Sequence, residues 1–203
     1  MNSPLTKQQY RLLALAQRAA LSPADQAKAT ERVWTALTQY MEDQFGSRSS
    51  LMVMIYLPIP NSQELDLIPW AQQVKANHPS WQFCVPYLER GNPDMTAANY
   101  DPLNGNLTIG PFRVPQPADY QQTDPTTIDV VIAPTLVVDI NGNRVGYGKG
   151  YYDRFLTTCR ADVMPIGVGY WSAVPPISDV DPWDYTLKTY FDGRVELATP
   201  NYN

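Results

Sequence analysis

Four runs of apolar residues in the sequence do not alternate with polar positions. The first is LMVMIYL at 51–57, and similar runs lie at 81–87, 128–134 and 163–170. A strand that is covered on both faces, as in a parallel sheet between layers of helices, has this composition, whereas a strand with one face in water alternates. The runs therefore predict four strands of a buried, largely parallel sheet.

Other segments carry apolar residues at the spacing of a helix. In the first such segment they are Leu12, Leu13, Leu15, Ala16, Ala19 and Ala20. Ser22, Pro23 and Asp25 then have the composition of a helix start, and Gly46 is placed to end that helix. Ser62 is expected to cap a third helix.

The order of the predicted elements indicates the fold class. It reads strand, helix, strand, and then again strand, helix, strand, with the last helix at 150–159. Because crossovers between parallel strands are right-handed, this order predicts a three-layer α/β/α fold, Rossmann-like, with a largely parallel central sheet. Residues 89–126 are rich in Pro, Asn, Asp and Gly, which predicts long loops and a short hairpin that turns at Asn104-Gly105. We expect residues 1–203 to form a single domain.

The overall charge narrows the classes of partner. The 203 residues carry 15 Lys and Arg against 20 Asp and Glu, a formal net charge of −5. A chain this acidic, without a basic run, is a poor binder of nucleic acid or of an anionic membrane. The first residues lack the apolar core of a signal peptide, and the longest apolar run is too short to span a bilayer. We therefore expect a cytoplasmic protein with small-molecule partners.

The few cysteines and histidines exclude several kinds of active site. Cys84 and Cys159 show neither metal-ligand spacing nor a CxxC pair, so we expect reduced structural thiols. His78 is the sole histidine, and a place at the surface or in the last turn of a helix is its simpler interpretation. With one histidine, the chain is a poor candidate for a Ser-His hydrolase or a His-ligated zinc enzyme.

The segment PTLVVDINGNRVGYGKGYYDRF, at 134–155, holds the strongest chemical signal. Glycines alternate in GYGKG at 146–150, with Lys149 among them, Arg144 before them and an expected helix after them. Glycine lets backbone N–H groups approach an anion, a helix start adds partial positive charge, and two cations add full charges. This combination predicts a phosphate site, although it matches neither the P-loop nor the dinucleotide-binding pattern. A flexible loop with two solvated cations would have the same spacing.

Asp153 lies in the first turn of the helix that follows the glycines, and two interpretations remain open. An acidic residue at this place complements the helix dipole. It also suits Mg²⁺, which takes one or two carboxylates together with phosphate oxygens and water. Position along the chain does not choose between these roles.

The stretch from PTLVVD to GYGKGYYDR closely resembles the signature of 5-formyltetrahydrofolate cyclo-ligases, also called 5,10-methenyltetrahydrofolate synthetases. That signature has an apolar P-x-L-x-x-D, a turn, and then R-L-G-x-G-x-G-Y/F-Y-D. The family also has a Lys and an Arg one helical turn apart near the amino terminus, and Lys7 and Arg11 fit this feature. The resemblance is sharp across 134–155.

Two other parts of the chain resemble the family more loosely. QELDL at 63–67 follows the first predicted strand in the family's order, with Leu67 where Thr is usual. WDYTL at 183–187 is similar to a segment of bacterial members, with Thr186 where Pro is usual. The resemblance therefore extends over almost the whole chain, and it is weakest at 88–126.

The resemblance implies an enzyme that depends on ATP and Mg²⁺. Such an enzyme converts 5-formyltetrahydrofolate to 5,10-methenyltetrahydrofolate and releases ADP and phosphate. The formyl oxygen would attack the γ-phosphorus of ATP, and N10 of the folate would then close the ring on the phosphorylated formyl carbon. Reduced folate and ATP would be the partners.

The resemblance also assigns roles to side chains of this sequence. Lys149 and Arg144 would act in catalysis. The residues expected to bind ATP are Lys7, Arg11, Arg144, Gly146, Gly148, Lys149, Gly150, Tyr151 and Tyr152. The residues expected to contact the folate are Glu64, Phe112, Tyr147, Gly148, Lys149, Gly150 and Tyr151. The carboxylates expected to hold Mg²⁺ are Asp153 and Asp184, with Asp181 and Asp179 as alternatives to Asp184.

Other interpretations of these residues remain open. Lys7 and Arg11 suit an ordinary solvated helix face, and Glu64 beside Ser62 suits a helix start. Another enzyme on an α/β scaffold, such as a sugar-phosphate isomerase or a CoA transferase, would also use a glycine-rich anion loop. A protein that sequesters reduced folate without turnover is the alternative outside the enzymes, and it would need no triphosphate site.

Overall fold

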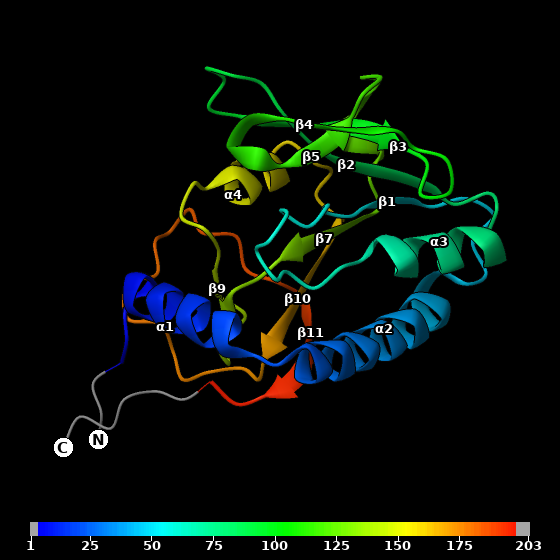
Figure 1. The fold of residues 1–203 in the computed structure, drawn as a ribbon. Coiled ribbons are helices and arrows are strands. Elements are labelled where there is room, and N and C mark those ends of the chain that lie inside the picture. Colours follow the sequence, from blue (N-terminus) through cyan, green and yellow to red (C-terminus); the bar gives the residue numbers. More distant parts are fainter. Residues whose placement is uncertain (1–3, 198–203) are drawn as a thin grey trace.

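The computed structural model describes residues 4–197, and a seven-stranded sheet runs through their centre (Figure 1). The strand order is β11-β10-β7-β1-β2-β3-β6. The strands of the sheet are β1 (Met52–Met54), β2 (Gln82–Leu88), β3 (Met95–Tyr100), β6 (Gln122–Thr123), β7 (Val130–Pro134), β10 (Met164–Trp171) and β11 (Thr189–Val195). Neighbours from β11 to β2 are parallel, while β3 and β6 pair antiparallel at one edge. The predicted α/β class with a largely parallel sheet is confirmed.

The central strands are apolar on both faces because both faces are covered. In β1, Val53 and the following Ile55 belong to one hydrophobic cluster, and Met54 between them belongs to a second cluster on the other face. The same division separates Val130 from Val131 in β7. Successive side chains of a strand point to opposite faces, so burial of both faces removes the alternation from the sequence.

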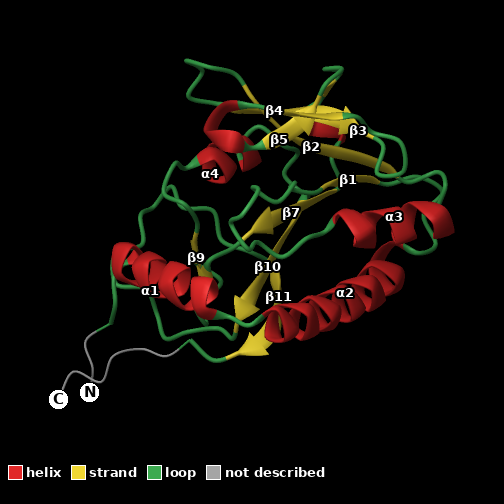
Figure 2. Cartoon of the chain, in the orientation of Figure 1, coloured by secondary structure: helices red, strands yellow, loops and turns green. Residues whose placement is uncertain are grey.

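Helices supply the two outer layers. They are α1 (Lys7–Ala20), α2 (Pro23–Phe45), α3 (Ile68–Asn77) and α4 (Tyr151–Leu156). Figure 2 shows α2 and α3 on one side of the sheet and α4 on the other, where the Phe155 and Leu156 side chains complete the second cluster. This is the predicted three-layer arrangement, with one layer reduced to a short helix and a hairpin. Within residues 4–197, every helix is too short or too polar to cross a bilayer.

Capping side chains start the long helices where the sequence predicts. The Ser22 hydroxyl accepts a hydrogen bond from the Asp25 backbone N–H at 3.1 Å, and Gly46 follows the last residue of α2. At the start of α1, Thr6 and Gln9 form a reciprocal capping box. Each cap satisfies backbone N–H groups that have no partner inside the helix.

The expected helix start at Ser62 is wrong. α3 begins at Ile68, whose backbone N–H donates to Asp66 Oδ1 at 2.8 Å. The Ser62 hydroxyl is used inside the preceding loop, where it donates to Glu64 Oε2 at 3.1 Å and accepts from the Glu64 N–H at 3.2 Å. Because this local exchange occupies the hydroxyl, Ser62 shapes a loop and does not cap a helix.

The expected hairpin exists, but its turn lies further along the chain. β4 (Leu107–Ile109) pairs antiparallel with β5 (Pro115–Pro117), and the short 3₁₀ segment Pro111–Arg113 lies between them. Asn104-Gly105 instead closes a turn before β4, where the Gly105 N–H donates to the Asp101 carbonyl at 2.7 Å. The Asn-Gly pair correctly predicted a turn, but that turn does not join the two strands of the hairpin.

A second hairpin carries the glycine-rich segment. β8 (Val137–Val138) pairs with β9 (Arg144–Val145), and Gly142 in the turn has φ +83°. Asp139, with 1% of its surface exposed, accepts four hydrogen bonds here. Its Oδ1 accepts from the N–H groups of Asn141 and Asn143 at 2.9 Å, and its Oδ2 accepts from Asn143 Nδ2 and the Ile177 N–H at 3.0 Å. One carboxylate thus joins the hairpin to the segment that leads to Asp179–Asp184.

We expect the Asp139→Asn variant to lose about 2–4 kcal/mol of unfolding free energy, because the amide replaces one acceptor oxygen by an NH₂ donor, which faces N–H donors and leaves them unsatisfied. Urea unfolding followed by circular dichroism measures the change. Asp162→Asn, at a carboxylate with 78% of its side chain exposed, is the matched control and should change stability little. Equal stability of the two variants would contradict the bridging role of Asp139.

Candidate active site

A cavity of about 940 Å³ opens beyond the carboxyl ends of β1 and β7. Its walls come from the amino-terminal half of α1, the loop after β1, the β4–β5 hairpin, the glycine-rich loop with α4, and residues 179–184. Open α/β sheets place ligands at this edge, because loops from neighbouring strands meet there. Segments from both ends of the chain therefore share one cavity.

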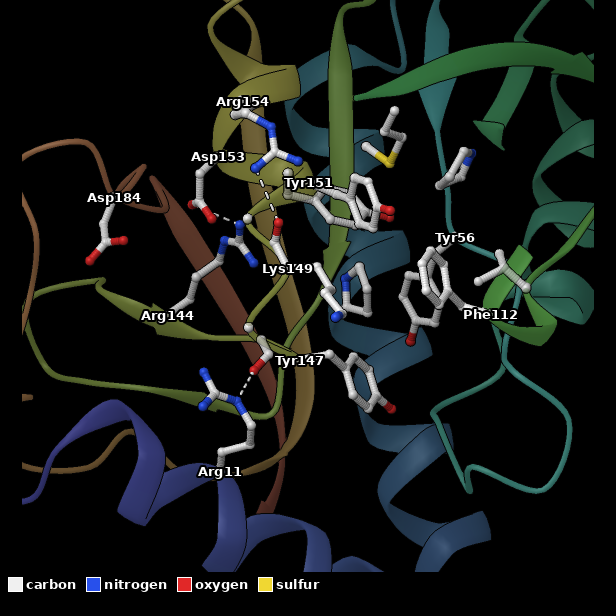
Figure 3. A pocket seen from close by; sticks show the side chains of 18 of the residues that line it. Arg11, Tyr56, Phe112, Arg144, Tyr147, Lys149, Tyr151, Asp153, Arg154 and Asp184 are labelled. Atoms are coloured by element: carbon white, nitrogen blue, oxygen red, sulfur yellow. Dashed lines mark hydrogen bonds and ion pairs between the residues drawn. The ribbon is translucent and has the colours of Figure 1, made fainter. Parts of the chain in front are cut away.

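The predicted site residues gather in this cavity. Those that line it are Lys7, Arg11, Glu64, Phe112, Arg144, Gly146, Tyr147, Gly148, Lys149, Gly150, Tyr151, Tyr152, Asp153, Asp179 and Asp184. Figure 3 shows Arg144 and Lys149 between the carboxylates of Asp153 and Asp184 on one side and Tyr56 on the other. Asp181 is the one candidate that is not part of the lining.

The glycine loop is held in place from two sides. Arg11 Nε donates to the Gly146 carbonyl at 2.8 Å, and Arg154 Nη1 donates to the Lys149 carbonyl at 3.1 Å. Gly148 has φ +83°, and a Cβ at this position would lie 3.2 Å from the Arg11 guanidinium. Glycine is required both by the left-handed backbone and by this close approach. The loop therefore lies against α1 with its path defined.

Arg144 and Tyr152 place unsatisfied polar atoms at the cavity. The Arg144 side chain is 6% exposed, and its Nη2 donates to Asp153 Oδ1 at 2.8 Å. Among residues 4–197, neither its buried Nε nor the buried Tyr152 hydroxyl has a hydrogen-bond partner. Buried N–H and O–H groups without partners are costly and uncommon. Both atoms are closed to solvent, so a ligand in the cavity would reach them only after neighbouring side chains move.

Lys7 joins the amino terminus to the acidic segment near the carboxyl terminus. Its Nζ lies 2.7 Å from both Asp181 Oδ2 and Asp184 Oδ2, and its backbone N–H donates to Asp179 Oδ1 at 2.6 Å. Burial acts to lower the pKa of Lys7, but hydrogen bonds and the charges of Asp181 and Asp184 outweigh it, so the pKa lies above its usual value. Lys7 therefore remains a cation and gathers three carboxylates.

The carboxylates fit one kind of metal ion better than others. Within residues 4–197, no group of three or more His, Cys, Asp or Glu side chains is close enough to hold a metal alone. Asp153 and Asp184 both line the cavity, and each is paired with a cation. Zinc needs more protein ligands than this, whereas Mg²⁺ takes one or two carboxylates and completes its shell with phosphate oxygens and water.

Glu64 is fixed at another part of the lining. Its Oε2 accepts hydrogen bonds from the Ile59 backbone N–H at 2.7 Å and from the Ser62 hydroxyl at 3.1 Å. Asn61 and Gln63 in the same loop have φ +65° and +55°, in the left-handed region that non-glycine residues seldom adopt. Backbone conformations of this kind cluster at active sites and ligand clamps, which agrees with the place of this loop in the cavity wall.

An apolar wall completes the cavity, and sequence reasoning missed most of it. It consists of Pro86, Leu88, Met95 and Val114, with Phe112 at its edge, 61% exposed. The Lys149 ammonium lies 5.7 Å from the centre of the Phe112 ring. These residues come from β2, β3 and the β4–β5 hairpin, so no short motif joins them.

Three further polar residues near the cavity escaped the sequence reasoning. Tyr56 and Arg154 line the cavity, and Arg18 is buried on α1 behind it. The sequence did contain a signal for Arg18, because it follows Lys7 by eleven residues, which is about three turns of a helix. At about 100° per residue, Lys7, Arg11 and Arg18 fall within about 40° on one helix face.

His78 and the cysteines lie outside the cavity lining. His78 follows the last residue of α3, where its Nε2 lies 2.7 Å from Glu42 Oε1 and its ring stacks on Trp81. Cys84 and Cys159 are free thiols, as expected, and burial raises the pKa of Cys159 to about 11. These residues support packing and surface contacts.

Comparison with known proteins connects this cavity to one family. A sequence model described as the 5-formyltetrahydrofolate cyclo-ligase family matches residues 5–188. The Escherichia coli K12 5-formyltetrahydrofolate cyclo-ligase is 25% identical over 75% of this chain and 90% of that protein. The Mycoplasma genitalium 5-formyltetrahydrofolate cyclo-ligase is 36% identical over 66 residues, which are 32% of this chain and 39% of that protein.

Two solved structures share the fold. The NMR structure of Aquifex aeolicus 5,10-methenyltetrahydrofolate synthetase superposes with a TM-score of 0.70 at 23% identity, covering 97% of this chain and 95% of that one. The Mycoplasma pneumoniae 5,10-methenyltetrahydrofolate synthetase also has a TM-score of 0.70, at 20% identity, covering 91% and 97%. At these identities the likeness shows a common architecture.

Proposed function

The chain belongs to the 5-formyltetrahydrofolate cyclo-ligase family, and we propose that it converts 5-formyltetrahydrofolate to 5,10-methenyltetrahydrofolate with the hydrolysis of ATP. One observation carries the proposal. A single cavity joins cations and carboxylates suited to a triphosphate with a fixed glutamate and an apolar wall suited to a folate. Its volume of about 940 Å³ leaves room for the reacting ends of both substrates.

The phosphate end of the reaction is assigned to Arg144, Lys149 and Arg11. Phosphoryl transfer depends on position and on neutralising charge more than on a protein nucleophile. Arg144 lines the cavity beside Asp153, and Arg11 fixes the loop that carries Lys149. Gly146, Gly148 and Gly150 allow the backbone to approach the same phosphates.

Asp153 and Asp184 are the residues that would hold Mg²⁺, and the ion would neutralise charge on the phosphate oxygens. Both carboxylates are already paired, with Arg144 and Lys7 respectively. An arriving cation would compete with these pairs, and it would free Arg144 and Lys7 to turn toward phosphate. Asp179 also lines the cavity and remains an alternative to Asp184.

Folate binding is assigned to Glu64 and the apolar wall, with Phe112, Tyr147 and Tyr151 beside them. In the proposed reaction the formyl oxygen attacks the γ-phosphorus and ADP leaves. N10 then attacks the formyl carbon and gives its proton to solvent, and phosphate leaves as the ring closes. No covalent bond to the protein is needed, so the residues act by placing N5, N10 and the γ-phosphate together.

An absorbance assay tests the proposal, because 5,10-methenyltetrahydrofolate absorbs in the near ultraviolet and the 5-formyl compound does not at the same wavelength. We expect a rise when the protein, Mg-ATP and 5-formyltetrahydrofolate are mixed, and none when ATP is left out. No rise with active folate would reject the proposal. Calorimetry would then show whether the protein binds folate without Mg-ATP, which is the behaviour of a sequestering protein.

We expect the Glu64→Gln variant to raise the KM for 5-formyltetrahydrofolate about tenfold or more, because it replaces a fixed charged acceptor by a neutral amide. The KM for ATP should stay within about twofold, since Glu64 is assigned to the folate. Steady-state kinetics with each substrate varied in turn separate the two values. Glu31→Gln, at an exposed position on α2, is the control. An unaltered folate KM would remove Glu64 from the folate site.

A further inference from the structure

Arg18 is a buried cation that the proposed reaction has not used. It is 6% exposed and lies on the same face of α1 as Lys7 and Arg11. Figure 1 shows α1 running beside β9, and hydrogen bonds from Arg11 and Arg18 join this face to the glycine-rich segment. Arg18 is absent from the lining of the main cavity, and it lines a small chamber of about 10 Å³ behind it.

The chamber adjoins the main cavity, because several residues line both. Tyr56, Glu64, Pro134 and Tyr147 line both. Arg18 therefore contacts, from the chamber, residues that also line the main cavity, where a ligand would bind. Arg18 can therefore act on a bound folate only through these shared residues, because it does not itself line the main cavity.

Tyr147 is the direct partner of Arg18. Arg18 Nη2 donates to the Tyr147 hydroxyl oxygen at 2.6 Å, and the guanidinium carbon lies 5.7 Å from the centre of the Tyr147 ring. A buried guanidinium needs polar partners, and Tyr147 supplies both its hydroxyl oxygen and the face of its ring to Arg18. The Tyr147 hydroxyl uses a lone pair to accept, so its proton remains available for another group.

Glu64 is the acidic group that faces this hydroxyl. Burial raises the pKa of Tyr147 to about 12, the negative charge of Glu64 acts in the same direction, and the charge of Arg18 opposes them. The hydroxyl is therefore protonated at neutral pH. Glu64 itself is fixed through Oε2 by Ile59 and Ser62, so the two polar groups are held from opposite sides.

We propose that Arg18 is a positioning residue for the folate, which holds the Tyr147 hydroxyl so that Tyr147 and Glu64 present a rigid polar pair to the substrate. This inference rests on the proposed function, since it takes Glu64 to bind folate. Arg18 does not touch the substrate and acts through Tyr147. The site accepts a reduced folate in one orientation because both members of the pair are fixed before binding.

A double-mutant cycle separates this role from simple support of α1. The variants are Arg18→Met, which keeps the apolar length of the side chain, Tyr147→Phe, and the two combined. Each single change should raise the folate KM about tenfold and leave the ATP KM within about twofold. The double variant should be no worse than about the larger single effect, because both changes break the same contact. Arg18→Lys, which keeps a charged donor, should recover most of the loss.

Three results would overturn the proposal. The first is an unchanged folate KM in Tyr147→Phe. The second is a folate KM in the double variant that rises by the product of the two single increases. The third is an increase in the ATP KM of the single variants that equals the increase in their folate KM. Tyr147 is 39% exposed, so Tyr147→Phe should fold even if Arg18→Met does not. In that case Arg18→Lys replaces Arg18→Met in the cycle, and effects of Arg18→Lys and Tyr147→Phe on the folate KM that multiply would overturn the proposal. The same cycle measured as calorimetric Kd for 5-formyltetrahydrofolate without ATP gives an answer if the wild-type protein binds folate without turnover. That case would reject the proposed function and still test Arg18.

Discussion

Replacement of Lys149 by alanine is expected to lower kcat/KM by about 10²- to 10³-fold, the usual cost of removing one fixed donor to developing charge. The Lys149 carbonyl is held by Arg154, and the glycines on either side define the loop. The substitution therefore removes the ammonium group while the loop keeps its path. Steady-state kinetics by the absorbance assay, with ATP and folate each varied, measure the loss.

The control for this variant is Lys28→Ala, which removes an exposed lysine from α2. Both variants lose one positive charge from the protein, so a general effect of net charge would appear in both. A Lys149→Ala protein with the kcat/KM of the Lys28→Ala protein would show that Lys149 takes no part in the reaction. The glycine loop would then serve only to shape the cavity.

The Asp153→Asn variant is expected to lose about 10²- to 10³-fold in kcat/KM and to need a higher Mg²⁺ concentration for half-maximal rate. Asn keeps the shape of the side chain and removes its charge. That charge pairs Arg144 at 2.8 Å, and in the proposed function it also holds the metal ion. Titration of Mg²⁺ at fixed ATP and folate measures the second effect apart from the first.

Asp43→Asn on the exposed side of α2 is the control for the Mg²⁺ titration. If Asp153→Asn lowered the rate without shifting the Mg²⁺ dependence, its role would be the orientation of Arg144 alone. An unchanged rate together with an unchanged Mg²⁺ dependence would remove Asp153 from the site. Asp184→Asn, tested in the same way, would distinguish Asp184 from Asp179 as the second carboxylate.

Sequence reasoning failed where a short signal had more than one possible use. Ser62 has the right type for a helix cap, but its hydroxyl bonds with Glu64 and α3 begins at Ile68. Asn104-Gly105 turns the chain, but the strand that follows pairs with β5 and does not return along β3. In both cases the competing partner is determined by packing beyond the local segment.

Local sequence was sufficient for features that depend on neighbours in the chain. Non-alternating runs identified β1, β2, β7 and β10, because a strand covered on both faces has no polar side to show. The cap at Ser22 was equally readable, since capping is a property of a few consecutive residues.

The meeting of distant charges required the folded chain. The pairing of Lys7 with Asp181 and Asp184 spans more than 170 residues, and the contact of Arg18 with Tyr147 spans 129. A charged side chain has the same type whether it is solvated or paired, so sequence cannot say which partner it meets. Only the order of strands in the sheet, which brings α1, the glycine loop and the acidic segment to one edge, makes these residues a site.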